Sequence, residues 1–172
     1  MSSPVVIRCG VEPDAAALLS MWDRAIVWLV ARGQTMQWGT EPVSERPGAR
    51  DRAHDWATGS GLRVAEIDGQ AVGMSVIGGP HPSHVPAIAA RETYLQFLIS
   101  DRDHAGKGIG EELVRRAIAD ARAAGSEILR VDCWAGAPSL VAWYERQRFV
   151  RTDTFTVDLR GGWHGQVFEL IL

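Results

Sequence analysis

The stretch 104–114 carries the residues most suited to chemistry, because three glycines alternate with other residues directly before an amphipathic helix: Gly106, Gly108 and Gly110. The apolar run 94–99 before it is typical of a buried strand. Unpaired N–H groups and the helix dipole attract anions at a helix N-terminus, and glycines let further amides turn inward. Lys107 adds a positive charge. The loop therefore predicts a phosphate or pyrophosphate ligand.

Two common phosphate-binding motifs do not fit this loop. A Walker loop needs Lys followed by Ser or Thr after its last glycine, but Glu111 and Glu112 stand there. The dinucleotide fingerprint has unevenly spaced glycines early in a domain, whereas these are evenly spaced and lie well down the chain. The ligand is therefore neither a Walker-type nucleotide nor a dinucleotide.

A second motif follows about thirty residues later, where the strand-like run 128–132 leads into a short helix, 140–146. Together the two stretches resemble the GNAT superfamily of N-acetyltransferases. That family holds the pyrophosphate of acetyl-CoA with Arg/Gln-x-x-Gly-x-Gly/Ala, and Ala105 stands where Arg or Gln is usual. The later family helix is Asn-x-x-Ala-x-x-x-Tyr-Glu-x-x-Gly-Phe. Three residues match this pattern: Tyr144, Glu145 and Phe149. Two residues depart from it, with Ala137 in place of Asn and Arg148 in place of Gly.

The resemblance implies the GNAT fold for one domain, 1–172: an α/β (α+β) arrangement with a mixed central sheet of about seven strands, partly splayed and flanked by helices. It implies acetyl-CoA as co-substrate and no metal. It also implies these CoA-binding residues: Leu98, Ile99, Ser100, Ala105, Gly106, Lys107, Gly108, Ile109, Gly110, Glu111, Ser139 and Tyr144. Arg102, His104 or Lys107 could replace the side chain missing at position 105.

The catalytic roles implied by the resemblance fall on two residues. Tyr144 matches the family tyrosine that protonates the leaving thiolate, and a phenol can do so at neutral pH. Glu92, at the start of the central strand, is the first choice for the base that accepts the proton of the amine. A solvated surface glutamate is the alternative for Glu92. Three histidines are further base candidates: His81, His84 and His164.

The acceptor site is assigned to three residues by the same resemblance: Trp38, His84 and His164. Trp38 lies in the irregular segment after the first helix, where relatives build one wall of the acceptor pocket, and capping the core is an equal alternative. Cys133 is expected to pack in a buried strand.

The composition limits the class of protein and the kinds of partner that the chain can have. The 172 residues are 46% hydrophobic and 23% charged, which is ordinary for one globular domain. A net charge of -3 argues against nucleic-acid binding. Two cysteines form neither a disulfide framework nor a zinc cluster. The N-terminus lacks the pattern of a signal peptide and no run could span a bilayer, so cytoplasmic location without membrane contact is expected. A homodimer is left open.

The periodicity predicts elements in the order βααβββαβαββ. Strands are expected at 5–9, 62–67, 71–77, 93–100, 128–132, 149–157 and 166–172. Helices are expected from Glu12-Pro13-Asp14 to Gly33 and at 49–58, 109–124 and 140–146, with a loop at 78–90.

The sequence thus predicts an N-acetyltransferase that moves an acetyl group from acetyl-CoA to a primary amine of a small molecule or peptide. The alternative is a non-catalytic acyl-CoA-binding module with a sensor or assembly role. It draws on the three departures from the family motifs: Ala105, Ala137 and Arg148.

Overall fold

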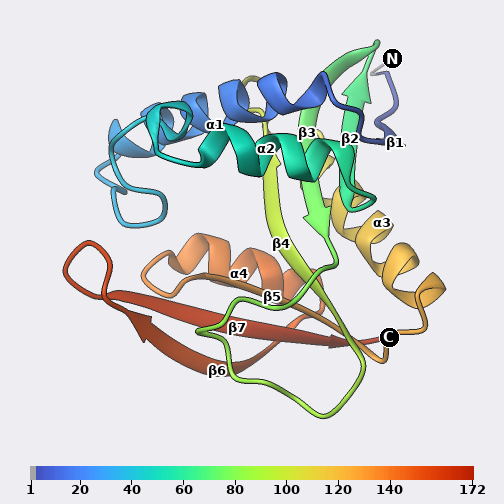
Figure 1. Cartoon of the computed structure of the whole chain (residues 1–172), viewed down its shortest axis with the longest axis vertical. Helices are drawn as coiled ribbons and strands as arrows, with labels where there is room; N and C mark the ends of the chain where they lie inside the picture. Colours follow the sequence, from blue (N-terminus) through green and yellow to red (C-terminus); the bar gives the residue numbers. More distant parts are fainter. Residues whose placement is uncertain (1–2) are drawn as a thin grey trace. The chain divides into compact units, whose positions relative to one another are not determined.

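The computed structural model describes residues 3–172, whose helices and strands follow the predicted order (Figure 1). The strands form one mixed seven-stranded sheet in the order β1-β2-β3-β4-β5-β7-β6, which confirms the predicted fold class. The chain forms two compact units. Unit 1 comprises Met1–Val76 and Phe97–Arg116, and unit 2 comprises Ile77–Gln96 and Ala117–Leu172.

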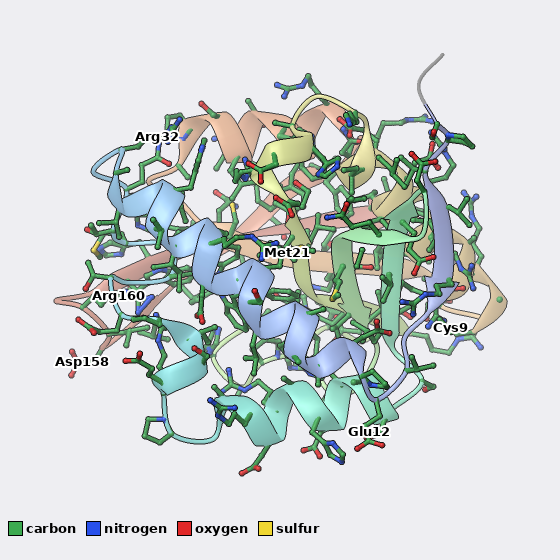
Figure 2. The ribbon with its side chains drawn as sticks, turned by 90° about the horizontal axis from the view of Figure 1, so that it is seen from above. Cys9, Glu12, Met21, Arg32, Asp158 and Arg160 are labelled. Atoms are coloured by element: carbon green, nitrogen blue, oxygen red, sulfur yellow. The ribbon has the colours of Figure 1, made fainter. Side chains whose placement is uncertain are left out.

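Unit 1 contains the antiparallel strands β1 and β2, most of β3, the end of β4, helices α1 and α2, and the start of α3. The bounds of these elements are β1 Val6–Cys9, α1 Asp14–Val30, α2 Ala49–Thr58, β2 Leu62–Ile67, β3 Gln70–Ile77, β4 Glu92–Ser100 and α3 Ile109–Ala123. Helices α1 and α2 lie side by side (Figure 1). Glu12 and Arg32 mark the chain just before and just after α1 in Figure 2.

The strands of unit 1 are covered on both faces because their apolar side chains alternate. One face packs against α1 and α2 through a buried cluster that includes Leu62, Val64 and Met74. The opposite face packs against Ile109 and Leu113 of α3. This second contact is close, because a Cβ on Gly73 would lie 2.5 Å from the Ile109 side chain. A glycine in β3 therefore lets the N-terminus of α3 rest directly on the strand.

Unit 2 contains the start of β4, the end of α3, helix α4 and the strands β5, β7 and β6. Their bounds are β5 Ile128–Trp134, α4 Pro138–Arg146, β6 Val150–Val157 and β7 Trp163–Ile171. The parallel ladder between β4 and β5 spans residues 92–94, and Leu95 and Gln96 continue the strand beyond it. β7 pairs antiparallel with both β5 and β6. Asp158 and Arg160 mark the β6–β7 turn in Figure 2.

Most element boundaries agree with the sequence to within two residues, and the end of α1 and the start of β7 differ most. α1 ends at Val30, three residues before the expected Gly33, and β7 already begins at Trp163, three residues before the expected start at 166. His164 therefore lies within β7, in register with Thr156 of β6, and the expected position between the last two strands is wrong. The sequence also gave no sign of two short 3-10 helices, Val43–Glu45 and Arg102–His104.

An ion pair fixes the start of α1 in unit 1. Arg8 of β1 donates to both carboxylate oxygens of Asp14, with distances of 2.7 and 2.9 Å. Asp14 is buried and also accepts from the Val11 N–H. The hydrogen bonds from Arg8, opposed by burial, lower the pKa of Asp14. A lowered carboxyl pKa means that the native state gains stability above the ordinary pKa and loses it as the pH falls through the native value.

Replacing Asp14 by asparagine is therefore expected to destabilise the protein by about 1–3 kcal/mol near pH 7, because it removes charged hydrogen bonds. The difference from wild type should shrink as the pH falls toward about 3. Urea unfolding at both pH values measures it. Asp51→Asn, in the exposed first turn of α2, is the matched control. Equal losses in both variants, or a loss independent of pH, would contradict the assignment.

Candidate active site

The predicted phosphate loop lies in unit 1 between β4 and α3. Gly106 and Gly108 have φ values of 79° and 73°, a region that residues with a Cβ rarely adopt. α3 begins at Ile109, so the first N–H groups of this helix have no partner within the helix itself. Lys107 is exposed between the two glycines. The loop thus has the conformation, the helix N-terminus and the charge that an anion site requires.

The start of the loop is held by side chains on both sides. Asp101 is buried, and one of its oxygens accepts from the Asp103 N–H at 3.1 Å. Its other oxygen accepts from Arg24 of α1 at 2.9 Å. The Asp101 N–H donates to the carbonyl of Val72 in β3 at 2.8 Å. These contacts fix the point at which the chain leaves β4 and enters the loop.

Three residues are candidates to replace the Arg or Gln side chain that the family motif has at position 105. The structure places them in different surroundings. The Arg102 guanidinium stacks on Trp28 at 4.7 Å, and Arg32 (Figure 2) stacks on the same indole at 3.9 Å. Burial and Arg32 lower the pKa of Arg102. The His104 Nδ1 atom is buried with no hydrogen-bond partner among residues 3–172. Arg102 is thus held on Trp28, Lys107 is an exposed cation within the loop, and the His104 side chain has a buried polar atom without a partner in the described part of the chain.

The residues assigned to the pantetheine side follow along β4 in unit 1. Ile99 is buried with the α1–α2 cluster, Leu98 packs on the opposite cluster, and Ser100 is partly exposed. Their main chain therefore belongs to a strand supported on both faces. Rigid support of this kind is what backbone groups need if they are to bind a substrate.

Trp38 packs beside this part of β4. Its ring lies 5.7 Å from Trp22 and 6.1 Å from Phe97, and it is only partly buried. The Trp38 carbonyl accepts from Arg46, and Asp23 of α1 accepts from the Val43 N–H at 2.6 Å. The irregular segment that carries Trp38 is therefore fixed against α1. Trp38 covers the core and also presents part of its ring outward.

Tyr144 lies on α4 in unit 2 and is 5% exposed. Its ring packs against Phe149 at 5.8 Å and Phe168 at 5.2 Å. Its hydroxyl has no hydrogen-bond partner among residues 3–172. Burial first, and then Cys133 and Asp132, raise its pKa, so the phenol stays protonated throughout the neutral range. Burial likewise raises the pKa of Cys133 to about 12, as expected for a packed thiol.

Glu92 is not the solvated surface glutamate that was the alternative at this position. Its side chain is 16% exposed, and both of its oxygens are engaged. Oε1 lies 2.6 Å from His81 Nδ1, and Oε2 accepts from Arg130 Nη1 at 2.9 Å. Arg130 is completely buried and also faces Glu169 at 3.2 Å. Arg130 is a site residue that was not predicted, although a charged residue inside the strand-like run 128–132 was an available signal.

The other predicted site residues of unit 2 lie in different surroundings. His84 stacks on Phe155 of β6 at 4.5 Å. His164 is exposed on β7, and its Nδ1 lies 2.9 Å from the Thr156 hydroxyl. Ser139 is exposed in the first turn of α4, directly after Pro138. Of these, only His84 shares the 78–91 loop with His81.

A mixed seven-stranded sheet flanked by helices, with a glycine-rich loop between β4 and α3, matches the fold of the acetyltransferase (GNAT) family. The chain belongs to the acetyltransferase (GNAT) family, whose family model matches residues 24–149. The family and the fold support acetyl transfer from acetyl-CoA to an acceptor. No curated protein sequence matches the chain.

Solved structures of similar fold come from several bacteria. A GCN5-related N-acetyltransferase from Rhodopseudomonas palustris has a TM-score of 0.74 and 20% identity over 100% of this chain and 98% of its own. The ribosomal-protein-alanine N-acetyltransferase from Brucella melitensis has a TM-score of 0.68 and 24% identity over 97% of this chain and 99% of its own. The Salmonella typhimurium protein yncA was solved with its cofactor acetyl-CoA. It has a TM-score of 0.69 and 16% identity over 98% of this chain and 94% of its own.

Among residues 3–172, no three His, Cys, Asp or Glu side chains gather as a metal site would need. Within the same residues, no helix is long and apolar enough to cross a membrane.

Proposed function

We propose that the chain acetylates a primary amine of a small molecule or peptide with acetyl-CoA as the donor. The observation that carries the proposal is the loop of unit 1, with two left-handed glycines, an exposed Lys107 and a helix N-terminus. These groups fit a pyrophosphate, and the residues 105–111 together with Ser139 would hold the cofactor. Acetyl-CoA supplies the activated acetyl thioester.

The transfer needs a neutral amine, a polarised carbonyl and a proton for the leaving sulfur. The amine nitrogen forms a bond to the acetyl carbon, the carbon–sulfur bond breaks, and the nitrogen loses a proton. Backbone N–H groups among residues 98–100 are proposed to bind the thioester oxygen, a contribution of about 3 kcal/mol in other acyl-transfer enzymes. Tyr144 is proposed to give its phenolic proton to the sulfur.

The base is proposed to be built around Glu92, because this carboxylate belongs to a buried network that ends at a histidine. The acceptor is proposed to contact Trp38, His84 and His164. For Trp38, this role is supported by two observations. The residue is only partly buried, and Arg46 binds its carbonyl.

Calorimetric titration tests the donor half of the proposal. Acetyl-CoA and desulfo-CoA should both bind, because the loop recognises the pyrophosphate that they share, and ATP should bind far more weakly. Absence of binding by either CoA form at millimolar concentration would contradict the proposed ligand.

Gly108→Ala is expected to weaken acetyl-CoA binding at least about tenfold, which corresponds to about 1.4 kcal/mol. A Cβ at φ 73° is strained, and relaxation of that strain would turn the loop amides away from the pyrophosphate. Gly69→Ala is the matched control: its φ is 76°, a Cβ there would also meet nothing within 4 Å, and it lies in the β2–β3 turn. Equal affinity losses in the two variants would contradict the assignment.

A non-catalytic acyl-CoA-binding module is the second candidate, and Ala105 favours it. Residue 105 is exposed and offers no side chain to close over a pyrophosphate. Such a module would bind acetyl-CoA as above but release no CoA thiol with any amine. Thiol release that depends on an added amine separates the two candidates.

A further inference from the structure

A histidine–carboxylate pair lies at the start of β4 in unit 2. His81 Nδ1 is 2.6 Å from Glu92 Oε1, and Arg130 holds the other carboxylate oxygen at 2.9 Å. A carboxylate bound to a guanidinium accepts hydrogen bonds, so the proton in the bond to His81 is on Nδ1. The neutral His81 ring then has its lone pair on Nε2. No hydrogen-bond partner of Nε2 is found among residues 3–172, and the His81 side chain is 27% exposed.

The segment that carries His81 is docked on one face of the sheet of unit 2. The Gln96 side chain donates to the Gly78 carbonyl, and the Gly78 N–H donates to the Tyr94 carbonyl at 3.0 Å. Val85 is buried against Tyr94. The alternate β4 residues Glu92, Tyr94 and Gln96 therefore all contact the 78–91 segment. His81 sits on an anchored segment rather than on a free loop.

This arrangement distinguishes His81 from Glu92 as the group that can reach a substrate. Glu92 is the less exposed of the two, and each of its oxygens already has a donor. A direct proton transfer to Glu92 would have to displace His81 or Arg130. His81 Nε2 has a free lone pair at the outer end of the same network.

We propose that His81 is the catalytic base: its Nε2 accepts the proton that the amine loses as the nitrogen–carbon bond forms. Glu92 is then a positioning residue, which fixes the ring and its tautomer, and Arg130 fixes Glu92. After transfer, the imidazolium passes its proton to water, which restores the neutral ring. This inference rests on the proposed function, because it assigns a residue to that reaction.

Charged groups from every neighbouring strand of unit 2 contribute to the electrostatics of His81. Glu92 of β4 and Arg130 of β5 are its direct network. Glu169 of β7 and Asp153 of β6 lie behind them, 3.2 and 3.8 Å from the Arg130 guanidinium. His84 lies three residues further along the same segment. Three carboxylates therefore surround one guanidinium, which makes this network acidic overall.

The test is His81→Asn, followed by kcat/KM for the amine as a function of pH. The asparagine amide occupies the place of Nδ1 and can still donate to Glu92, so the segment stays anchored while the lone pair of Nε2 is lost. We expect kcat/KM to fall by about a hundredfold near neutral pH. The wild-type acid limb should be replaced by a rise that follows only the neutral amine. Acetyl-CoA affinity should be unchanged.

A purely structural His81 would leave His81→Asn with the wild-type pH profile, and that result overturns the inference while the proposed function stands. Wild-type protein that acetylates no amine overturns the proposed function, and the base assignment with it. His54→Gln, an exposed histidine of α2, is the control for the loss of an imidazole and should keep the wild-type profile. Should His81→Asn fold poorly, His81→Gln also removes the titrating imidazole, with its amide nearer the place of Nε2, and a wild-type pH profile there would equally overturn the inference.

Discussion

Replacing Tyr144 by phenylalanine is expected to lower kcat by about a hundredfold to a thousandfold, while acetyl-CoA binding and stability stay near wild type. The phenol is proposed to protonate the leaving thiolate, and phenylalanine has no proton to give. The ring contacts to Phe149 and Phe168 remain in this variant. The hydroxyl has no hydrogen-bond partner among residues 3–172, so its loss leaves no buried group unsatisfied.

The other tyrosine of the chain, Tyr94, supplies the matched control, because its hydroxyl is hydrogen-bonded whereas that of Tyr144 is not, within the described residues. Tyr94 donates to Asp132, whose pKa is raised by burial. Tyr94→Phe should therefore cost about 1–3 kcal/mol of stability, because Asp132 loses its donor. Its kcat should change by a few-fold at most. Stopped-assay kinetics and urea unfolding on both variants test this opposition. Equal kcat for wild type and Tyr144→Phe would remove Tyr144 as the acid.

Replacing Arg130 by methionine is expected to destabilise the protein by about 3–5 kcal/mol. Arg130 is completely buried, and its guanidinium lies 2.9 Å from Glu92 and 3.2 Å from Glu169. Its removal would leave two carboxylates facing a buried apolar side chain without a counter-charge. Urea unfolding near pH 7 measures the loss.

Two comparisons show whether charge is the cause of this loss. Adding Glu92→Gln and Glu169→Gln to the methionine variant should recover much of the stability, because the two less exposed carboxylates are then neutral and the third, Asp153, is 46% exposed. Arg151→Met breaks an ion pair with Glu145 of similar length, 2.7 Å, but on the exposed surface. It should have no resolvable effect on stability. A loss in the triple variant equal to that of Arg130→Met alone would instead indicate lost packing.

Most helices and strands could be predicted from patterns that are local in the sequence. The helix at 49–58 and the strand at 62–67 have the predicted limits. The Asp68-Gly69 turn adopts positive φ at both residues, 51° and 76°, as that dipeptide favours in tight hairpins. Each of these signals depends on neighbours a few residues apart. For the same reason the glycine loop could be placed between its strand and helix from sequence alone.

The surroundings of the site residues could not be predicted in the same way, because they depend on contacts distant in sequence. Glu92 and Arg130 meet across the β4–β5 ladder, 38 residues apart. His81 reaches Glu92 because Gln96 and Val85 dock its segment, which periodicity does not reveal. The start of β7 was predicted too late, and His164 was therefore expected before the strand, because β7 begins earlier than its apolar pattern, with Gly165 packed against Phe155. A histidine near a strand could be recognised, but its partner could not.

The central claim is amine acetylation, and product analysis with acetyl-labelled acetyl-CoA tests it most directly. The protein is incubated with the labelled donor and a panel of small amines and amino-terminal peptides, and label in amide products is measured beside CoA thiol release. We predict label in at least one amine product and one thiol released for each amide formed, with both at least about a hundredfold slower in Tyr144→Phe. Binding of acetyl-CoA without any labelled product across the panel would contradict the account and leave the non-catalytic module.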